Sequence, residues 1–149
     1  MSIIRDEMPA LVRHEGDWAG TYTVIDNQGN ILDNYNSHIT CKFPEKEAFP
    51  YFQTNRYDWP DGKHQEYSFP GMYKDKQLWF DTERIEGHAW QTDPSTIILY
   101  FSYKGVPEPI YIYELIVISP CNNHRARTWH WFKNNQIYQR TLIKEERVL

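Results

Sequence analysis

The feature that most constrains this chain is a succession of short segments of alternating apolar and polar residues, separated by clusters of Gly, Pro, Asn, Asp and Ser. We expect strands over residues 18–25, 31–43, 51–59, 64–69, 77–82, 88–92, 96–103, 110–119, 125–132 and 137–147. About ten strands at a spacing of roughly 8–12 residues are typical of an up-and-down β protein. No intervening stretch is long enough for a crossover helix, which excludes a parallel sheet.

Composition and the first residues complete the predicted fold. The chain has 149 residues, of which 40% are hydrophobic and 16% aromatic, and this supports one β-rich domain over residues 1–149. One short helix is expected over residues 8–16, where Pro9 suits a first helical position and Gly16 a stop. We therefore predict an all-β fold, a single antiparallel up-and-down β-barrel of about 8–10 strands, because closure removes the exposed sheet edges.

Charge and cysteine usage exclude several classes of partner. The net charge is -4 and no Lys/Arg cluster follows a phosphate backbone, so we expect no nucleic acid. No apolar run reaches the roughly 18 residues of a membrane span, and the first residues lack the apolar core of a signal peptide, which predicts a cytoplasmic protein without a membrane partner. Cys41 and Cys121 are expected to be free thiols outside any metal-binding spacing, so neither a metal nor a cofactor is predicted. A homodimer is left open.

The motif Gly16-Asp17-Trp18 resembles the Gly-x-Trp signature of the lipocalin and calycin superfamily. The resemblance implies that Trp18 closes one barrel end beneath an Arg near the last strand, for which Arg140 and Arg147 are the candidates. The wider chain resembles a lipocalin-like domain family of unassigned function found mainly in bacteria. The stretches that carry this resemblance are residues 14–22, 53–57, 80–84 and 125–129. The family implies a barrel but no reaction.

Two functional groups of the wider superfamily can be compared with the chain. Nitrobindin-type barrels bind haem through a His near the C-terminus, whereas His124 and His130 both precede the final segment, residues 137–147, which has no His. Haem is therefore not expected. Bilin lyases of calycin type, which attach chromophores to partner proteins, resemble this chain in architecture only.

One face of the segment 51–59 combines aromatic rings with neutral hydrogen-bonding groups, as ligand pockets do. Its members are Gln53, Asn55, Tyr57 and Trp59. We predict that this face lines a ligand cavity; alternatively, the two amides bond each other or face water.

Glu114 interrupts the most apolar segment of the chain, residues 110–118, in which both faces are apolar. A carboxylate there must be paired or take up a proton, and Arg127 on the neighbouring segment is its natural partner. Both a structural ion pair and a role in ligand contact or acid–base chemistry stay open. Arg127 shares a face with Trp129, which suggests either a clamp for a carboxylate-bearing ligand or simple barrel packing.

His88 shares a face with Trp90 and is the best-placed group for proton transfer at neutral pH, although a lone His is more often a surface or hydrogen-bonded residue. No nucleophile elbow or phosphate-binding loop occurs. The predicted catalytic residues are Glu114, His88 and Arg127, and the predicted ligand-binding residues are Gln53, Asn55, Tyr57, Trp59, Trp90, Tyr113 and Trp129. The leading hypothesis is a barrel that binds a small, largely apolar or aromatic molecule. The alternative is a cofactor-independent isomerase, cyclase or lyase acting on such a molecule by enclosure and acid–base catalysis.

Overall fold

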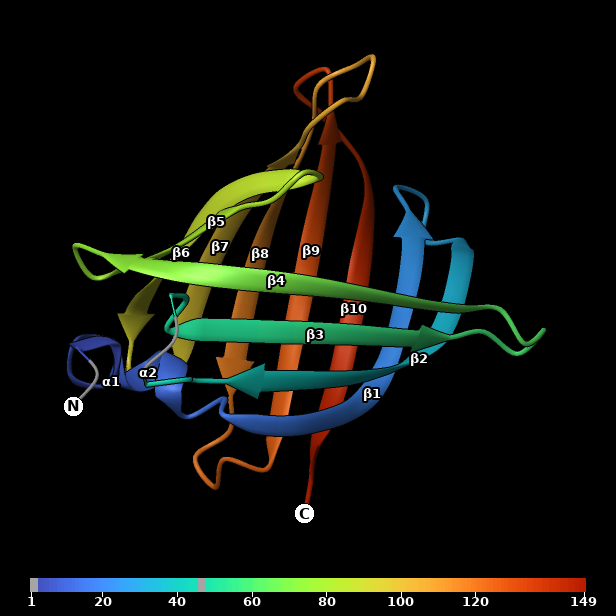
Figure 1. Ribbon diagram of the computed structural model, residues 1–149. Coiled ribbons are helices and arrows are strands. Elements are labelled where there is room, and N and C mark those ends of the chain that lie inside the picture. The colour runs from blue at the N-terminus through green and yellow to red at the C-terminus, as the bar shows by residue number, and fades with distance from the viewer. Residues whose placement is uncertain (1–2, 46–47) are drawn as a thin grey trace.

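A computed structural model describes residues 3–45 and 48–149, which form a closed antiparallel barrel of ten strands preceded by two short helices (Figure 1). The helices are α1 (Ile3–Glu7) and α2 (Pro9–Val12). The strands are β1 (Gly16–Asp26), β2 (Ile31–Lys42), β3 (Tyr51–Asp58), β4 (His64–Lys74), β5 (Gln77–Asp81), β6 (Ile85–Asp93), β7 (Thr96–Tyr103), β8 (Ile110–Ile118), β9 (His124–Lys133) and β10 (Gln136–Val148). The predicted all-β barrel is confirmed.

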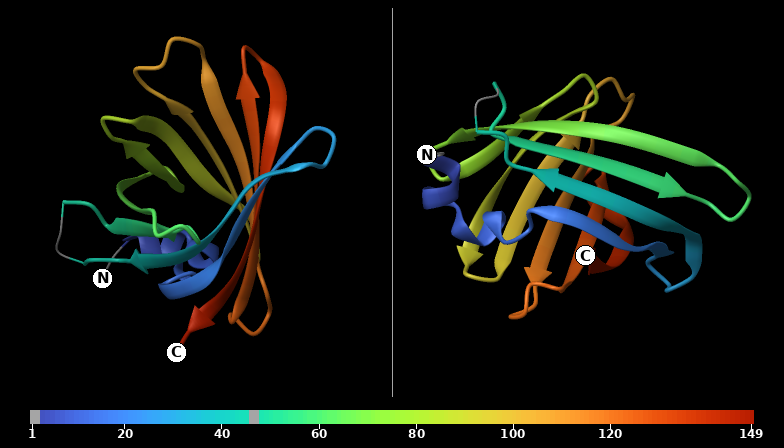
Figure 2. Two further views of the ribbon diagram at one scale, coloured as in Figure 1. Left: turned by 90° about the vertical axis from the view of Figure 1, so that its right-hand side faces the viewer. Right: turned by 60° about the horizontal axis from the view of Figure 1, so that its bottom comes forward.

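Each strand pairs with its neighbour in sequence, and β1 pairs with β10 to close the barrel, so that Tyr22 lies opposite Ile143. In Figure 1, β2, β3 and β4 cross in front of β8, β9 and β10, and the views in Figure 2 show the interior between these two halves. Because the order is strictly up and down, alternate turns lie at opposite ends of the barrel. We call the end with turns 27–30, 59–63, 82–84, 104–109 and 134–135 the open end, and the opposite end, with α1 and α2, the closed end.

The largest differences from the predicted elements lie in the helix and in β4. The predicted helix over residues 8–16 is wrong in extent, because α2 ends at Val12 and Gly16, with φ of +121°, begins β1. Strand β4 continues through Pro70 and Gly71, which were predicted to end it. A Cβ atom at Gly71 would lie 2.7 Å from Leu78 Cδ1, so this glycine permits close strand packing rather than a turn.

Trp18 fills the closed end of the barrel. It is fully buried, and its Nε1 donates a hydrogen bond of 3.0 Å to the backbone oxygen of His14. The guanidinium groups of Arg147 and Arg125 lie over the indole ring, at 4.5 Å and 4.6 Å from its centroid. Of the two arginines implied by the resemblance, Arg147 therefore takes the role, and Arg125 is an unexpected second partner. Cation–π contacts and burial together stabilise this plug.

The two helices cover the same end with apolar side chains, since Ile4, Met8 and Leu11 are buried. No helix within residues 3–45 and 48–149 has the length and apolar character needed to cross a membrane. With one end plugged, the barrel interior is accessible from the open end.

Candidate functional site

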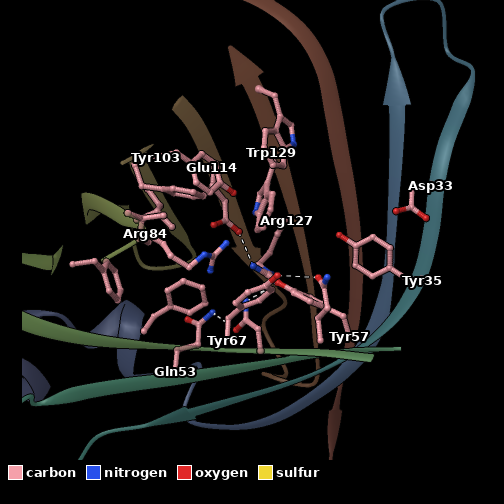
Figure 3. A pocket seen from close by; sticks show the side chains of 18 of the residues that line it. Asp33, Tyr35, Gln53, Tyr57, Tyr67, Arg84, Tyr103, Glu114, Arg127 and Trp129 are labelled. Atoms are coloured by element: carbon pink, nitrogen blue, oxygen red, sulfur yellow. Dashed lines mark hydrogen bonds and ion pairs between the residues drawn. The ribbon is translucent and has the colours of Figure 1, made fainter. Parts of the chain in front are cut away.

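A cavity of about 210 Å³ occupies the barrel interior above the closed end (Figure 3). Its walls come from β2 to β9 and from the turn before β6. The lining residues are Asp33, Tyr35, Gln53, Asn55, Tyr57, Trp59, Gln65, Tyr67, Phe69, Phe80, Arg84, Ile85, Leu99, Phe101, Tyr103, Glu114, Arg127, Trp129 and Trp131. They combine aromatic rings with a few polar groups, which is the usual character of a small-molecule site.

Aromatic rings form two walls of the cavity. On the first, Tyr35 packs against both Trp59 and Tyr57, with ring centroids 4.4 Å and 5.3 Å from its own. On the second, Tyr103 stacks on Trp131 with centroids 5.9 Å apart and an interplanar angle of 12°. Burial raises the pKa of Tyr35, Tyr57 and Tyr103. Their hydroxyl groups therefore remain protonated at neutral pH and can donate hydrogen bonds.

A chain of side-chain hydrogen bonds runs along the inner face of β3. The Tyr51 hydroxyl donates to Gln53 Oε1 at 2.6 Å, Gln53 Nε2 donates to Asn55 Oδ1 at 2.8 Å, and Asn55 Nδ2 donates to the Tyr57 hydroxyl at 2.8 Å. The two amides thus bond each other, as one reading of the sequence expected, and they line the cavity, as the other expected. Each amide is fixed by its neighbours, which gives this wall a defined hydrogen-bonding pattern.

Arg127 forms the floor of the cavity. Its Nη1 donates to Glu114 Oε2 at 2.8 Å, its Nε donates to Glu145 Oε1 at 2.7 Å, and its Nη2 donates to the Tyr22 hydroxyl. The predicted pairing of Glu114 with Arg127 is therefore present, and both side chains are almost completely buried.

Glu145 completes the ion-pair network beneath the cavity and was not predicted from the sequence. It lies on the inner face of β10 with a side chain that is 0% exposed, and Arg125 Nε donates to its Oε1 at 2.7 Å. Burial alone would raise the pKa of Glu145, but the guanidinium groups of Arg127 and Arg125 outweigh it and lower the pKa to about 2. Two carboxylates, Glu114 and Glu145, thus balance two guanidinium groups beneath the cavity.

This balance determines what the floor offers a ligand. Arg127 already binds two carboxylates and a hydroxyl, so it is not a free clamp for a ligand carboxylate. Glu114 accepts a hydrogen bond from Arg127 through Oε2, and no group among residues 3–45 and 48–149 donates to its Oε1. Because Glu114 lines the cavity, this oxygen is the free acceptor at the floor.

The structure places three of the predicted site residues outside the cavity. His88 and Trp90 are on the outer face of β6 and Tyr113 is on the outer face of β8, because Ala89 and Ile112 beside them point inward and are buried. They belong to an outer aromatic cluster. This cluster consists of Trp79, His88, Trp90, Tyr100, Tyr111, Tyr113 and Phe132. The cavity contains the other predicted residues: Gln53, Asn55, Tyr57, Trp59, Glu114, Arg127 and Trp129.

Several lining residues were not predicted. Asp33 and Tyr35 lie on the inner face of β2, Tyr67 on that of β4 and Tyr103 on that of β7, while Arg84 reaches in from the turn before β6. Because side chains alternate along a strand, Asp33 and Tyr35 share one face of β2. Both would have been predicted if that face had been assigned to the interior. No group of three His, Cys, Asp or Glu side chains in the described ranges is placed to hold a metal ion.

The geometry predicts a moderate effect for Glu114→Gln. We expect the free energy of unfolding to fall by about 1.5–3 kcal/mol, the range for a hydrogen bond to a charged group. Arg127 and Arg125 then share Glu145, but each keeps a direct hydrogen bond to it, so neither guanidinium loses its last acidic contact. Equilibrium urea unfolding followed by Trp fluorescence measures the change. A loss as large as that caused by removing the Glu145 charge would contradict this assignment.

The fold and the cavity together define a lipocalin-like barrel with an internal cavity. The chain belongs to the family described as "Domain of unknown function (DUF3598), N-terminal", whose model matches residues 5–149. No protein of curated function matches the sequence significantly.

Two solved structures share the fold. A protein of unknown function from the DUF3598 family of Nostoc punctiforme aligns with a TM-score of 0.72 and 15% identity, over 93% of this chain and 49% of that one. An S-type phycobiliprotein lyase from Guillardia theta aligns with a TM-score of 0.70 and 14% identity, over 100% of this chain and 94% of that one. The chain thus spans about half the length of the Nostoc protein. At these identities the similarity shows the fold alone.

Proposed function

We propose that the barrel binds a small, largely apolar or aromatic molecule in the cavity above Arg127. The observation that carries this proposal is the aromatic cavity of about 210 Å³, closed at one end by Trp18 and accessible at the other. A barrel that needed only a packed core would fill this space with side chains. Here the free carboxylate oxygen of Glu114 faces the cavity instead, where a polar group of a ligand can meet it.

The cavity favours a flat ligand. Its volume lies below the roughly 300–1,000 Å³ of drug-sized sites, so a molecule of one or two fused rings fills it and a larger one extends through the open end. Tyr35 and Trp59 on one side and Tyr103 and Trp131 on the other offer ring faces and edges for stacking. The protonated tyrosine hydroxyls and the amides of β3 supply hydrogen bonds to a carbonyl or hydroxyl.

An enzymatic role is the second candidate, and Glu114 is the observation that favours it. A carboxylate at the floor of an apolar cavity, held at Oε2 and free at Oε1, can accept a proton from an enclosed substrate. An isomerase, cyclase or lyase without a cofactor needs little more than such a group and enclosure. The fold shared with a phycobiliprotein lyase supports keeping lyase chemistry among these options. Mass spectrometry of the ligand after incubation with the protein separates the two functions. A ligand recovered unchanged favours a binding protein, and recovery of an isomer favours an enzyme.

A pair of matched substitutions tests the proposed binding. Leu99 lines the cavity from β7, and Leu115 lies on the outer face of the adjacent strand β8. We expect Leu99→Trp to weaken binding of the neutral dye N-phenyl-1-naphthylamine by at least about tenfold, because an indole occupies the ligand's space. Leu115→Trp makes the same change outside and should leave the affinity unaltered.

Fluorescence titration measures both dissociation constants, and thermal unfolding verifies that each variant is folded. Saturable binding with one site per chain is expected for the unmodified protein. Absence of saturable binding, or an equal affinity in Leu99→Trp, would show that the cavity is not the binding site.

A further inference from the structure

We infer that Arg84 at the cavity mouth recognises an anionic group, so that the ligand is an organic anion bound with its apolar part inward and its anion at the open end. The inference rests on the proposed binding function and adds the charge and orientation of the ligand. It depends on three features of the structure: the free charge of Arg84, the negative floor, and the asymmetry of the mouth.

Arg84 is held at the mouth by its backbone. Thr82 Oγ1 accepts hydrogen bonds from the backbone nitrogens of Arg84 and Ile85 at 3.2 Å and 3.1 Å, and the backbone nitrogen of Lys104 donates to the Arg84 oxygen at 2.7 Å. From this turn the side chain extends into the cavity (Figure 3), where its guanidinium lies 4.0 Å from the ring centroid of Tyr67. Stacking on Tyr67 orients the Arg84 guanidinium while leaving its N–H groups free for another partner.

Arg84 has no acidic partner within the part of the chain that the structure describes, residues 3–45 and 48–149. Among the charged side chains that line the cavity in the described ranges, Arg127 pairs with two glutamates, whereas Arg84 forms no ion pair with a carboxylate. Arg56, a half-buried arginine that does not line the cavity, is in contrast paired with Glu66 at 2.9 Å. A guanidinium that stays unpaired beside an aromatic pocket is suited to bind the carboxylate, sulfonate or phosphate of a ligand.

The other charges fix the direction in which an anion binds. Glu114 presents its free Oε1 at the floor and repels an anionic group there, while it accepts a hydrogen bond from an N–H or O–H group. Asp33, across the mouth from Arg84 in Figure 3, accepts hydrogen bonds from Trp59 Nε1 at 3.0 Å and 3.2 Å and is a second negative group. The electrostatic potential in the cavity is therefore most favourable for an anion beside Arg84. The N–H or O–H group of the ligand then points to Glu114.

Two dyes that differ by one anionic group test this inference. 1-Anilinonaphthalene-8-sulfonate and N-phenyl-1-naphthylamine share the same rings and N–H group, and only the first carries a sulfonate. We expect Arg84→Gln to weaken binding of the sulfonate dye by about tenfold, the lower range for a charged hydrogen bond at a partly exposed site, and to change the neutral dye by less than about twofold. Arg84→Lys should retain most of the affinity, because the charge remains.

Lys133→Gln is the matched control. It removes one positive charge at the same end of the barrel, but Lys133 contacts Tyr138 and does not line the cavity. Neither dye should respond to it. Raising the salt concentration from about 20 mM to about 500 mM should weaken binding of the sulfonate dye to the unmodified protein. The same change should have little effect on its binding to Arg84→Gln.

The outcomes separate this inference from the proposed function. Equal losses for both dyes in Arg84→Gln, or no loss for either, would overturn the role of Arg84 while leaving cavity binding intact. If the neutral dye binds the unmodified protein and loses affinity in Leu99→Trp but not in Leu115→Trp, that result supports the proposed function by itself. If neither dye binds the unmodified protein, both the proposed function and this inference are wrong.

Discussion

Replacing Glu145 by Gln is expected to lower the free energy of unfolding by about 3–5 kcal/mol, the cost of breaking a buried ion pair from one side. Glu145 accepts hydrogen bonds of 2.7 Å from both Arg125 Nε and Arg127 Nε, and its side chain is fully buried. Without its charge, two buried guanidinium groups share only Glu114. This network is therefore expected to matter more for stability than any single contact in the cavity.

The neighbouring residue provides the control. Glu146 is exposed, with a side chain 70% accessible, and its ion pair with His124 measures 3.9 Å. We expect Glu146→Gln to change the unfolding free energy by less than about 0.5 kcal/mol. Urea unfolding at pH 7 compares the two variants directly. Similar midpoints for both would mean that the Glu145 charge is not what stabilises the closed end.

Acid conditions give an independent measure of the same group. The pKa of Glu145 is about 2 in the fold, below the value of about 4.3 for an unfolded chain. Its contribution is fully present above about pH 4.3 and is lost as the pH falls towards 2, because the unfolded state takes up the proton first. In Glu145→Gln this part of the acid dependence should be absent.

The sequence was sufficient to predict the barrel, because the period-2 pattern and most of the turn residues mark the strands and their order. Strand β7 begins at Thr96 and ends at Tyr103, as predicted. The pairing of Glu114 with Arg127 also followed from the sequence, since a carboxylate between isoleucines on an apolar strand requires a partner.

Assigning the inner face was harder where both faces of a strand are apolar or aromatic. Trp90 on β6 and Tyr113 on β8 pack in the outer aromatic cluster, so their aromatic character did not distinguish inside from outside. Glu145 was hidden in the charged run 144–147, which is typical of an exposed strand end. Only the arginines facing it from β9 make its burial favourable, and this pairing depends on strand register.

The turn that carries Arg84 could not be predicted from the alternating sequence pattern either. The predicted strand began at residue 88, whereas β6 begins at Ile85 and brings Arg84 to the cavity mouth. The bonds from the backbone nitrogens of Arg84 and Ile85 to Thr82 Oγ1 shape this turn, and hydroxyl-capped turns of this kind have only weak sequence signals.

Acidification from pH 6.5 to pH 4.5 is expected to destabilise the protein through His14 by up to about 3 kcal/mol, or about 1.4 kcal/mol per pH unit. Burial and the guanidinium groups of Arg125 and Arg127 lower the pKa of His14 to about 2. Its Nδ1 lies 3.1 Å from Arg125 Nη1, which donates to the neutral ring. The unfolded chain binds a proton on His14 below about pH 6.5, whereas the folded protein does not. Stability is therefore retained above that pH and falls below it.

His14→Asn isolates this effect, because an amide oxygen can accept the Arg125 hydrogen bond in place of Nδ1 but does not titrate. The variant loses packing and is expected to be less stable at every pH, so the readout is the slope of unfolding free energy against pH between about 6.5 and 4.5. This slope should flatten in His14→Asn. An unaltered slope in His14→Asn would mean that His14 is protonated in the fold. The positive charge it would then carry beside Arg125 would add a third buried cation to the two guanidinium groups that Glu114 and Glu145 balance.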